Sequence, residues 1–454
     1  MKKIGYCLLV LAGLASTLYP AMSVGSSAAA LALTPPMGWN SWDSYGTTVR
    51  ENQVKSNADV MASRLARYGW RYIVVDIQWY EPNAQGHDYK PGARLTMDEY
   101  GRLTPATNRF PSAENGRGFA PLAGYVHSKG LKFGIHIMRG VPRQAVEANT
   151  PIWHSSYRAG EIADRRHICD WNPDMYGVDM SKPGAQDYYD SIAALYSSWG
   201  VDFIKADDMS RPYDLRRLEV VALSEAIRKT GRPIVLSLSP GPAPVLQAGD
   251  LEQHAQMWRI SDDFWDSWPL LKKQFDYTRD WAPYIGKDGT WPDADMLPFG
   301  KLRVASADNG PQETKFTPDE QQTVMTLWSI FRSPLIVGGD LPSSDAKTFA
   351  LLTNQDVLAI NQHSKNNRQV LERDDIRAWT AEADDKPGAR YVALFNTGEQ
   401  TKRIQFKWSD LGIDLQKPAV RDLWANKDMS ARDGIDVSLR PHASVLLRLS
   451  SSTS

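Results

Sequence analysis

The segment Trp199-Gly-Val-Asp-Phe-Ile-Lys-Ala-Asp207 sets the pattern from which the fold can be predicted. A helical face that includes Ile192 and Tyr196 precedes it, and Gly200 is the residue type that commonly ends a helix. A short apolar strand, 201–206, follows and runs into acidic residues. The segment therefore predicts one helix–strand unit of a parallel sheet.

The same order of amphipathic helix, glycine and apolar strand recurs along the chain, with Gly69, Gly130 and Gly231 at the helix ends. Strand positions can be placed at 37–42, 72–76, 131–138, 201–206, 233–238, 257–260, 294–297 and 334–337. Eight such strands alternating with helices predict a (β/α)8 TIM barrel. An open, doubly wound sheet is the alternative, but no glycine-rich phosphate loop follows the first strand.

The pattern changes at about Lys365 to short strands with alternating apolar and polar residues. These strands are expected at 377–379, 391–395, 403–406 and 444–449, with turn residues such as Pro387-Gly388 between them. Alternation of this kind predicts a C-terminal antiparallel β-sandwich. We therefore expect three parts: a signal peptide over 1–32, a catalytic barrel over 33–364 and a sandwich over 365–450.

The N-terminus has the features of a secretory signal. Lys2 and Lys3 precede an apolar run over 4–19, and small residues follow at 28–30. The run is shorter than the roughly 20 apolar residues that a membrane span needs. We expect a protein exported to the periplasm or the extracellular medium, without membrane insertion.

Composition excludes several classes of function. The chain of 454 residues has a formal net charge of −1 and no long run of one sign, so it lacks the basic surface expected of a nucleic-acid-binding protein. Its two cysteines are Cys7, inside the expected signal, and Cys169, which leaves no pair for an internal disulfide or a Cys/His metal cluster. We expect neither a metal nor a cofactor, and the sequence indicates no particular oligomeric state.

Residues that could carry chemistry lie where the predicted strands end, because the active site of a (β/α)8 barrel forms at the C-terminal ends of its strands. Any single Asp there could equally cap a helix. Carboxylates at the ends of three strands, however, supply the nucleophile or base and the acid that glycoside cleavage needs. The residues at these ends are Trp42, Asp76, His136, Lys205 with Asp207 and Asp208, Ser239, and Arg259 with Asp262 and Asp263.

Three of these residues have a plain chemical use in such a site. Lys205 would hold Asp207 ionised, as a nucleophile must be. Trp42 offers a flat apolar face for a sugar ring. Arg259 offers a forked donor for hydroxyl groups.

Longer motifs carry a family resemblance. They are Thr34-Pro-Pro-Met-Gly-Trp-Asn-Ser-Trp42, Val75-Asp76 followed by Trp79, Trp199 to Asp207, Trp258-Arg259 with Ser261-Asp262-Asp263, and Asp422-Leu-Trp424. From about Leu33 to Leu449 the sequence resembles glycoside hydrolase family 27, the α-galactosidase and α-N-acetylgalactosaminidase family. The resemblance implies a retaining exo-glycosidase that removes terminal α-D-galactosyl residues through a covalent glycosyl-enzyme.

The resemblance also assigns roles by position. It implies that Asp207 is the nucleophile and Asp263 the acid/base, with the neighbouring Asp262 as the rival for the second role. The positions implied to contact the sugar are Trp42, Asp76, Lys205, Arg259, His136, which stands where the family commonly has Tyr, and Ser239, within the segment 237–240 that replaces the reader of the sugar 2-position.

Departures from the family pattern bear on the substrate. The usual pair of Asp residues after the second strand is here Asp76-Ile77, so one carboxylate that grips galactose hydroxyls is missing. Met209 replaces a Cys that normally joins a disulfide, and the insert 88–115 is long.

The main expectation is an α-galactosidase acting on galactose-containing oligosaccharides or glycoconjugates. The alternative is a β-L-arabinopyranosidase, whose sugar shares the ring stereochemistry of galactose but lacks the C6 hydroxymethyl. An α-glucan-cleaving member of the family is a further possibility. A non-catalytic sugar-binding barrel is less favoured, because both carboxylates, Lys205 and Arg259 stand at the motif positions.

Overall fold

The computed structural model describes residues 31–304, 310–431 and 433–451. Residues 1–30 of the expected signal peptide, and Cys7 with them, lie outside the described residues. None of the helices in the described ranges is long and apolar enough to cross a membrane.

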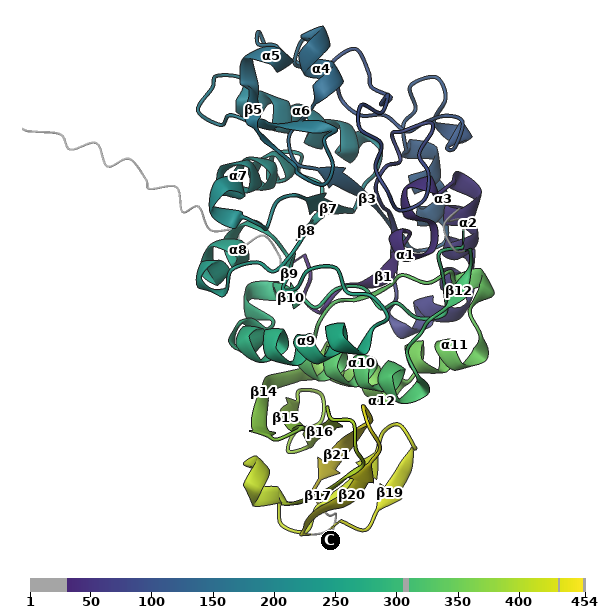
Figure 1. The fold of residues 1–454 in the computed structure, drawn as a ribbon, viewed down its shortest axis with the longest axis vertical. Coiled ribbons are helices and arrows are strands. Elements are labelled where there is room, and N and C mark those ends of the chain that lie inside the picture. Colours follow the sequence, from purple (N-terminus) through teal and green to yellow (C-terminus); the bar gives the residue numbers. More distant parts are fainter. Residues whose placement is uncertain (1–30, 305–309, 432, 452–454) are drawn as a thin grey trace, which may run out of the picture. The chain divides into compact units, whose positions relative to one another are not determined.

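An eight-stranded parallel sheet forms the first and larger part of the structure (Figure 1). Its strand order is β10-β9-β8-β7-β3-β2-β1-β13, and a parallel bridge between Leu297 and Val337 links its two edges. The predicted (β/α)8 barrel is thereby confirmed. The strands are β1 (Met37–Asn40), β2 (Tyr72–Val75), β3 (Lys132–Met138), β7 (Phe203–Asp207), β8 (Val235–Leu238), β9 (Met257–Arg259), β10 (Trp291–Asp293) and β13 (Leu335–Val337).

The seventh barrel strand differs from the prediction. We expected it at 294–297, but β10 is Trp291–Asp293. Asp293 faces the buried interior beside Arg259, so this strand is not an apolar run. Leu297, within the segment where the strand was expected, instead forms the bridge that links the sheet edges.

Helices surround this sheet (Figure 1). They are α1 (Trp42–Tyr45), α2 (Glu51–Val60), α3 (Ala120–Ser128), α4 (Arg143–Ala148), α5 (Ala159–Ile162), α6 (Ala185–Ser198), α7 (Tyr213–Lys229), α8 (Ala248–His254), α9 (Trp268–Trp281), α10 (Pro318–Phe331), α11 (Ala346–Leu352) and α12 (Gln355–His363). Short 3-10 or π turns extend or link several of them.

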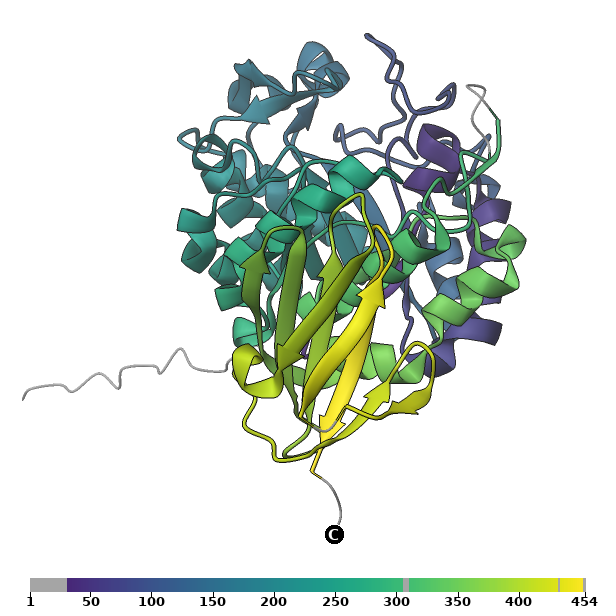
Figure 2. The same ribbon diagram turned by 60° about the horizontal axis from the view of Figure 1, so that its bottom comes forward.

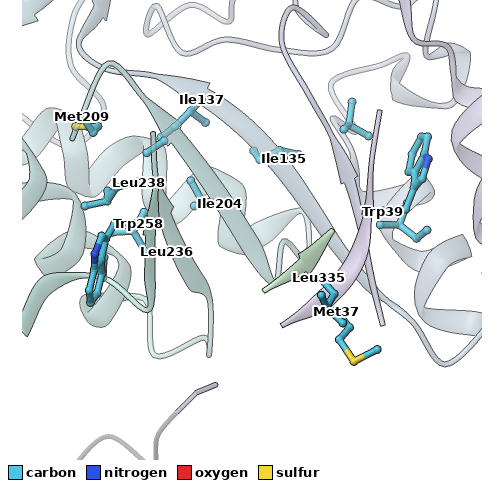
Figure 3. Packing of buried hydrophobic residues seen from close by; sticks show 14 of the residues in the cluster. Met37, Trp39, Ile135, Ile137, Ile204, Met209, Leu236, Leu238, Trp258 and Leu335 are labelled. Carbon is cyan, nitrogen blue, oxygen red and sulfur yellow. The ribbon is translucent and has the colours of Figure 1, made fainter. Parts of the chain in front are cut away.

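Alternation along each strand separates two sets of side chains, because successive residues of a strand point to opposite faces. On β7, Ile204 packs into the large core shared with the helices, together with Ile135 and Leu236 (Figure 3). Phe203, one residue earlier, belongs to a separate cluster inside the barrel that also contains Tyr72, Val74, Val235, Met257 and Trp291. The residues two positions further along, Lys205 and then Asp207, therefore face the interior as well.

Two small sheets were not anticipated from the sequence. The first has the order β4-β6-β5 and consists of β4 (Val141–Pro142), β5 (Ala163–Ile168) and β6 (Met175–Val178). The second pairs β11 (Lys301–Leu302) with β12 (Gln312–Glu313). Both lie between barrel strands in the sequence, and the first matters below because its β5–β6 loop carries Trp171.

The C-terminal part is the predicted antiparallel sandwich (Figure 2). One sheet has the order β14-β15-β16-β21-β18-β19 and the other pairs β17 with β20. Ile404 and Phe406 pack with Leu394 and Leu447 in a core of its own. Its strands are β14 (Ser364–Arg373), β15 (Ile376–Ala383), β16 (Arg390–Asn396), β17 (Lys402–Lys407), β18 (Ala419–Asp422), β19 (Lys427–Met429), β20 (Gly434–Leu439) and β21 (Ser444–Ser450).

Helix α10 joins the two parts. Its N-terminus is fixed by a capping box in which Thr317 accepts from the Glu320 amide and Glu320 accepts from the Thr317 amide. Further along, Gln322 donates to the Ser444 carbonyl at 2.9 Å and Thr323 donates to the His442 carbonyl at 2.7 Å. The sandwich is therefore anchored to a helix of the barrel and not tethered by a linker alone.

Candidate active site

A cavity of about 350 Å³ opens at the C-terminal ends of the barrel strands. Depth within it can be read from burial: Asp76 is 1% exposed, whereas Asp263 is 59% exposed. Its lining consists of Trp42, Asp43, Asp76, Ile77, His87, Tyr89, Trp171, Lys205, Asp207, Arg211, Pro240, Arg259, Asp262, Asp263, Phe264, Trp265, Asp295 and Met296. Of the eight predicted site residues, the cavity brings together six.

Asp207 ends β7 and carries the most strongly stabilised carboxylate of the cavity. His136 Nε2 lies 3.0 Å from its Oδ2, and the Asp208 amide donates to its Oδ1 at 3.1 Å. Burial opposes ionisation, but His136, Lys205 and the Ser239 hydroxyl together hold the pKa of Asp207 well below its usual range. The group is ionised at neutral pH, which is the state that a nucleophile needs.

His136 and Ser239 themselves do not line the cavity. Both are buried behind Asp207, His136 on β3 and Ser239 just after β8. They lie against Asp207, where both lower the pKa of its carboxyl group, and not where a sugar in the cavity would contact them.

Lys205 and Asp76 form an ion pair at the closed, buried end of the cavity, which we call the floor. Lys205 Nζ lies 2.9 Å from Asp76 Oδ2, and Asn40 donates to the same oxygen at 2.7 Å. Although burial opposes it, Lys205 and His136 lower the pKa of Asp76. Burial lowers the pKa of Lys205, but the neighbouring Asp76 and Asp207 raise it by more, so that the net shift is upward. Both groups are therefore charged at neutral pH.

Arg259, at the end of β9, faces two carboxylates. It lies 2.7 Å from Asp295 and 3.2 Å from Asp263. Asp262 instead pairs with Arg211 at 2.9 Å on the exposed rim. Both rivals for the acid/base role thus line the cavity, but Asp263 is the one held by the motif Arg259.

Three buried carboxyl groups of the floor were missed from the sequence. Burial and the neighbouring Asp295 raise the pKa of Asp43 well above its usual range, and the same two causes raise the pKa of Asp293 to about 7. Burial also raises the pKa of Asp295, against the attraction of Arg259. Asp43 fits only because Gly338 lies against it, where a Cβ would come within 1.8 Å of Asp43 Oδ2. The pKa values of these three groups are thus shifted in the direction opposite to those of Asp76 and Asp207.

The aromatic lining was also missed, apart from Trp42. Trp42 stacks parallel to Tyr89 at 6.2 Å, and Tyr89 contacts Trp171 at 5.3 Å between ring centroids. On its other side Trp42 meets His87 at 5.0 Å, and His87 meets Trp265 at 5.8 Å. Tyr89 comes from the insert whose length the sequence showed, but nothing in the sequence indicated that the insert reaches the site.

A buried ion network holds the back of Asp207. Arg139 donates to Asp208 at 2.8 Å and to Glu219 at 2.7 Å, and its backbone amide donates to the Asp207 carbonyl at 2.9 Å. Asp208 has a left-handed backbone with φ of 57°, a conformation that Asp tolerates better than most residues. In the described ranges, no group of three or more His, Cys, Asp or Glu residues is placed to hold a metal ion.

Comparison with known proteins agrees with this geometry. The family model described as "Alpha galactosidase A" matches residues 34–181 and 174–363, and that of the "Alpha galactosidase C-terminal beta sandwich domain" matches 373–449. The chain belongs to glycoside hydrolase family 27. It is therefore a glycoside hydrolase, and its substrate is a carbohydrate.

Relatives within family 27 differ in specificity. An α-galactosidase from Coffea arabica is 31% identical over 91% of this chain and 93% of its own length. A family 27 β-L-arabinopyranosidase from Geobacillus stearothermophilus is 50% identical, with a TM-score of 0.90 over 93% of this chain and 98% of that one. A Bacillus halodurans protein provisionally named an α-N-acetylgalactosaminidase is 49% identical, with a TM-score of 0.83 over 92% of this chain and 97% of that one.

Proposed function

We propose that this family 27 enzyme is a retaining β-L-arabinopyranosidase rather than the α-galactosidase first expected. One observation carries the proposal: Ile77, which lines the cavity and is 1% exposed, stands where the family usually has a second carboxylate. The 50% identity to the Geobacillus stearothermophilus β-L-arabinopyranosidase supports the same specificity.

The preference follows from the cost of burying a hydroxyl without a partner. The two sugars share their ring stereochemistry, and only galactose has the C6 hydroxymethyl. A hydroxyl placed against the apolar Ile77 loses its water and gains no acceptor, which costs about 1–3 kcal/mol. We expect kcat/KM for the β-L-arabinopyranoside to exceed that for the α-galactoside by roughly 5- to 150-fold.

The proposed mechanism uses two carboxyl groups with different tasks. Asp207, ionised at the floor, attacks the anomeric carbon while Asp263 protonates the leaving oxygen, which gives a glycosyl ester on Asp207. Asp263 then takes a proton from water as that water attacks the same carbon and the ester bond to Asp207 breaks, so the two displacements together retain the configuration. In this mechanism Asp76 and Lys205 bind the sugar hydroxyls, and Trp42 contacts the ring.

A substrate panel tests the specificity. The purified enzyme is assayed on p-nitrophenyl β-L-arabinopyranoside, α-D-galactopyranoside, α-D-glucopyranoside and α-N-acetylgalactosaminide. Ile77→Asp should raise the galactoside-to-arabinopyranoside ratio of kcat/KM, because the new carboxylate can accept from the C6 hydroxyl. Ile77→Val, which changes size without adding an acceptor, should leave that ratio near the wild-type value. A wild-type preference for any other member of the panel refutes the proposal.

A further inference from the structure

We infer that Asp295 is a positioning residue, which holds the acid/base Asp263 in place for proton transfer to the leaving oxygen. It acts through two neighbours of Asp263, the Arg259 side chain and the Phe264 backbone amide. The inference rests on the proposed mechanism, in which Asp263 is the acid/base. It assigns a task to a buried carboxyl group that the mechanism does not otherwise use.

The Asp263 side chain has little of its own to fix its orientation. It is 59% exposed, and among the described residues its carboxyl group has one side-chain partner, Arg259, whose Nη2 donates to it at 3.2 Å. An acid/base must come within about 2.6–3.2 Å of the atom that it protonates, so a carboxyl group that rotates freely is a poor proton donor. Arg259 is 4% exposed, and whatever holds its guanidinium therefore also limits where Asp263 can lie.

Asp295 contacts both neighbours of Asp263 with one oxygen atom. Its Oδ2 lies 2.7 Å from Arg259 Nη2, the nitrogen that also donates to Asp263. This is the shortest contact of Nη2 within the described ranges, so it does most to fix the guanidinium. The same Oδ2 accepts from the Phe264 amide at 2.8 Å, which fixes the backbone directly after Asp263. One oxygen thus restrains both the tip of the Asp263 side chain and the backbone that carries it.

The backbone holds Asp295 itself in a conformation that few residues adopt. Its φ is 83°, in the left-handed region that favours glycine. Two hydrogen bonds keep it there: the Asp295 amide donates to Asp293 Oδ1 at 2.9 Å, and the Trp328 indole donates to the Asp295 carbonyl at 2.8 Å. Strained conformations that several contacts maintain are common at functional sites. Here the result is a buried carboxyl group with a fixed direction.

A positioning role and a purely structural role predict different outcomes when Asp295 is replaced. An ion pair that only stabilised the barrel would, on its loss, lower activity equally on every substrate. A residue that positions the acid matters in proportion to the help that the leaving group needs, because a good leaving group departs without protonation. Substrates that share one sugar and differ in the leaving group therefore separate the two roles.

The experiment compares kcat/KM on the 2,4-dinitrophenyl and the phenyl glycoside of whichever sugar the panel shows to be preferred. Asp295→Gly removes the carboxyl group and suits the left-handed backbone. Its kcat/KM on the phenyl glycoside should fall at least about tenfold more than on the dinitrophenyl glycoside, since general acid catalysis contributes about 10²–10⁴-fold. Asp295→Asn keeps one acceptor oxygen for both contacts and should retain most of the activity on the phenyl glycoside.

A second background shows whether Asp295 acts through Asp263. In Asp263→Ala the acid is already absent, so adding Asp295→Gly should leave the phenyl-to-dinitrophenyl ratio of kcat/KM unchanged. Each ratio compares two substrates on one preparation, so incomplete folding cancels from it. If the glycine variant does not fold at all, Asp295→Ser, whose hydroxyl is too short to reach both donors, takes its place.

Asp43→Ala is the matched control. It removes another buried carboxyl group of the floor, one that forms no hydrogen bond or ion pair with Arg259 or Phe264 among the described residues. Whatever its effect on kcat/KM, that effect should be equal on the two substrates.

An equal fall on both substrates in Asp295→Gly would overturn the inference, and so would a further change of the ratio when this substitution is added to Asp263→Ala. In both cases Asp263→Ala alone would still depend on the leaving group, and the proposed mechanism would stand. If Asp263→Ala itself shows no such dependence, the proposed acid/base assignment fails and the inference fails with it.

Discussion

Replacing Arg139 by Met should show how much the ion network behind Asp207 contributes to stability. The Arg139 side chain is 1% exposed, and its partners Asp208 and Glu219 are almost as deeply buried. It also donates to the His167 carbonyl at 2.9 Å, so its guanidinium has protein partners on three sides. Met fills a similar volume without charge or donors.

The expected loss in the free energy of unfolding follows from the partners that Asp208 and Glu219 keep in the variant. Removing one partner of a buried ion pair costs about 3–5 kcal/mol, because a buried charge is left uncompensated. Asp208 would keep Arg216 at 3.4 Å, and Glu219 would keep the Tyr189 hydroxyl at 2.6 Å. Since neither carboxylate becomes fully unpaired, the loss should lie near the lower end, at about 3 kcal/mol.

The loss should also depend on pH. Burial already raises the pKa of Asp208 against the pull of Arg139 and Arg216, so removing Arg139 raises it further. Over the range between the unfolded and folded pKa values, the folded variant binds more protons than the unfolded chain. The free energy of unfolding therefore falls as pH rises, and the penalty should be larger at about pH 8 than at about pH 5.5.

Urea unfolding, followed by tryptophan fluorescence at both pH values, measures the free energy of unfolding of the variant and of the wild type. Arg403→Met is the matched control: it removes an arginine that is paired with Asp436 at 2.6 Å but lies on the surface, and its effect should be within error of zero. The reasoning is wrong if Arg139→Met loses no more stability than this control, or if its loss is the same at both pH values.

Three further predictions concern Asp207, its partner residues and the thiol. Asp207→Ala should abolish turnover on every substrate. Asp263→Ala should still cleave aryl glycosides with good leaving groups, and added azide should yield a glycosyl azide of retained configuration, which proton NMR identifies. The same azide rescue in Asp262→Ala would assign the acid/base role to Asp262 instead. His136→Phe should move the acidic limb of the kcat/KM profile to higher pH, because it removes a group that lowers the pKa of Asp207, while His136→Tyr keeps a donor and should move it less. Reductant should leave the melting temperature unchanged, because Cys169 is buried and is the only cysteine in the described ranges; a fall of several degrees would contradict this.

Much of the fold and the polar floor could be predicted because both follow from short-range patterns. A period of two along 203–207 places Lys205 and Asp207 on one face, and the helix–Gly–strand repeat places that face inside a barrel. Asp76 and Arg259 follow from the same rule at other strands. The prediction failed at the seventh strand because an inward-facing Asp293 and an adjacent Pro292 do not look like a buried apolar strand.

The mouth of the cavity could not be predicted because its residues come from loops without a repeating pattern. His87 and Tyr89 follow β2, Trp171 lies in the β5–β6 loop and Trp265 follows β9. Their meeting depends on how these loops fold over the barrel, and spacing in the sequence carries no information about that. The Arg139 network was missed for the same reason, since Arg139 and Glu219 lie 80 positions apart.

The pKa values of the carboxyl groups at the floor of the cavity depend on one another. Lys205 and Arg259 are the cations buried there, while Asp43, Asp76, Asp207, Asp293 and Asp295 supply more carboxyl groups than two cations can balance. The pKa values divide the groups accordingly: those of Asp76 and Asp207 are lowered and those of the other three are raised. If all were ionised, their mutual repulsion would raise the pKa of Asp207 and weaken it as a nucleophile at acidic pH. The raised pKa values of Asp43, Asp293 and Asp295 limit the negative charge that competes with Asp207 for these two cations, while His136 and Lys205 act on Asp207 directly.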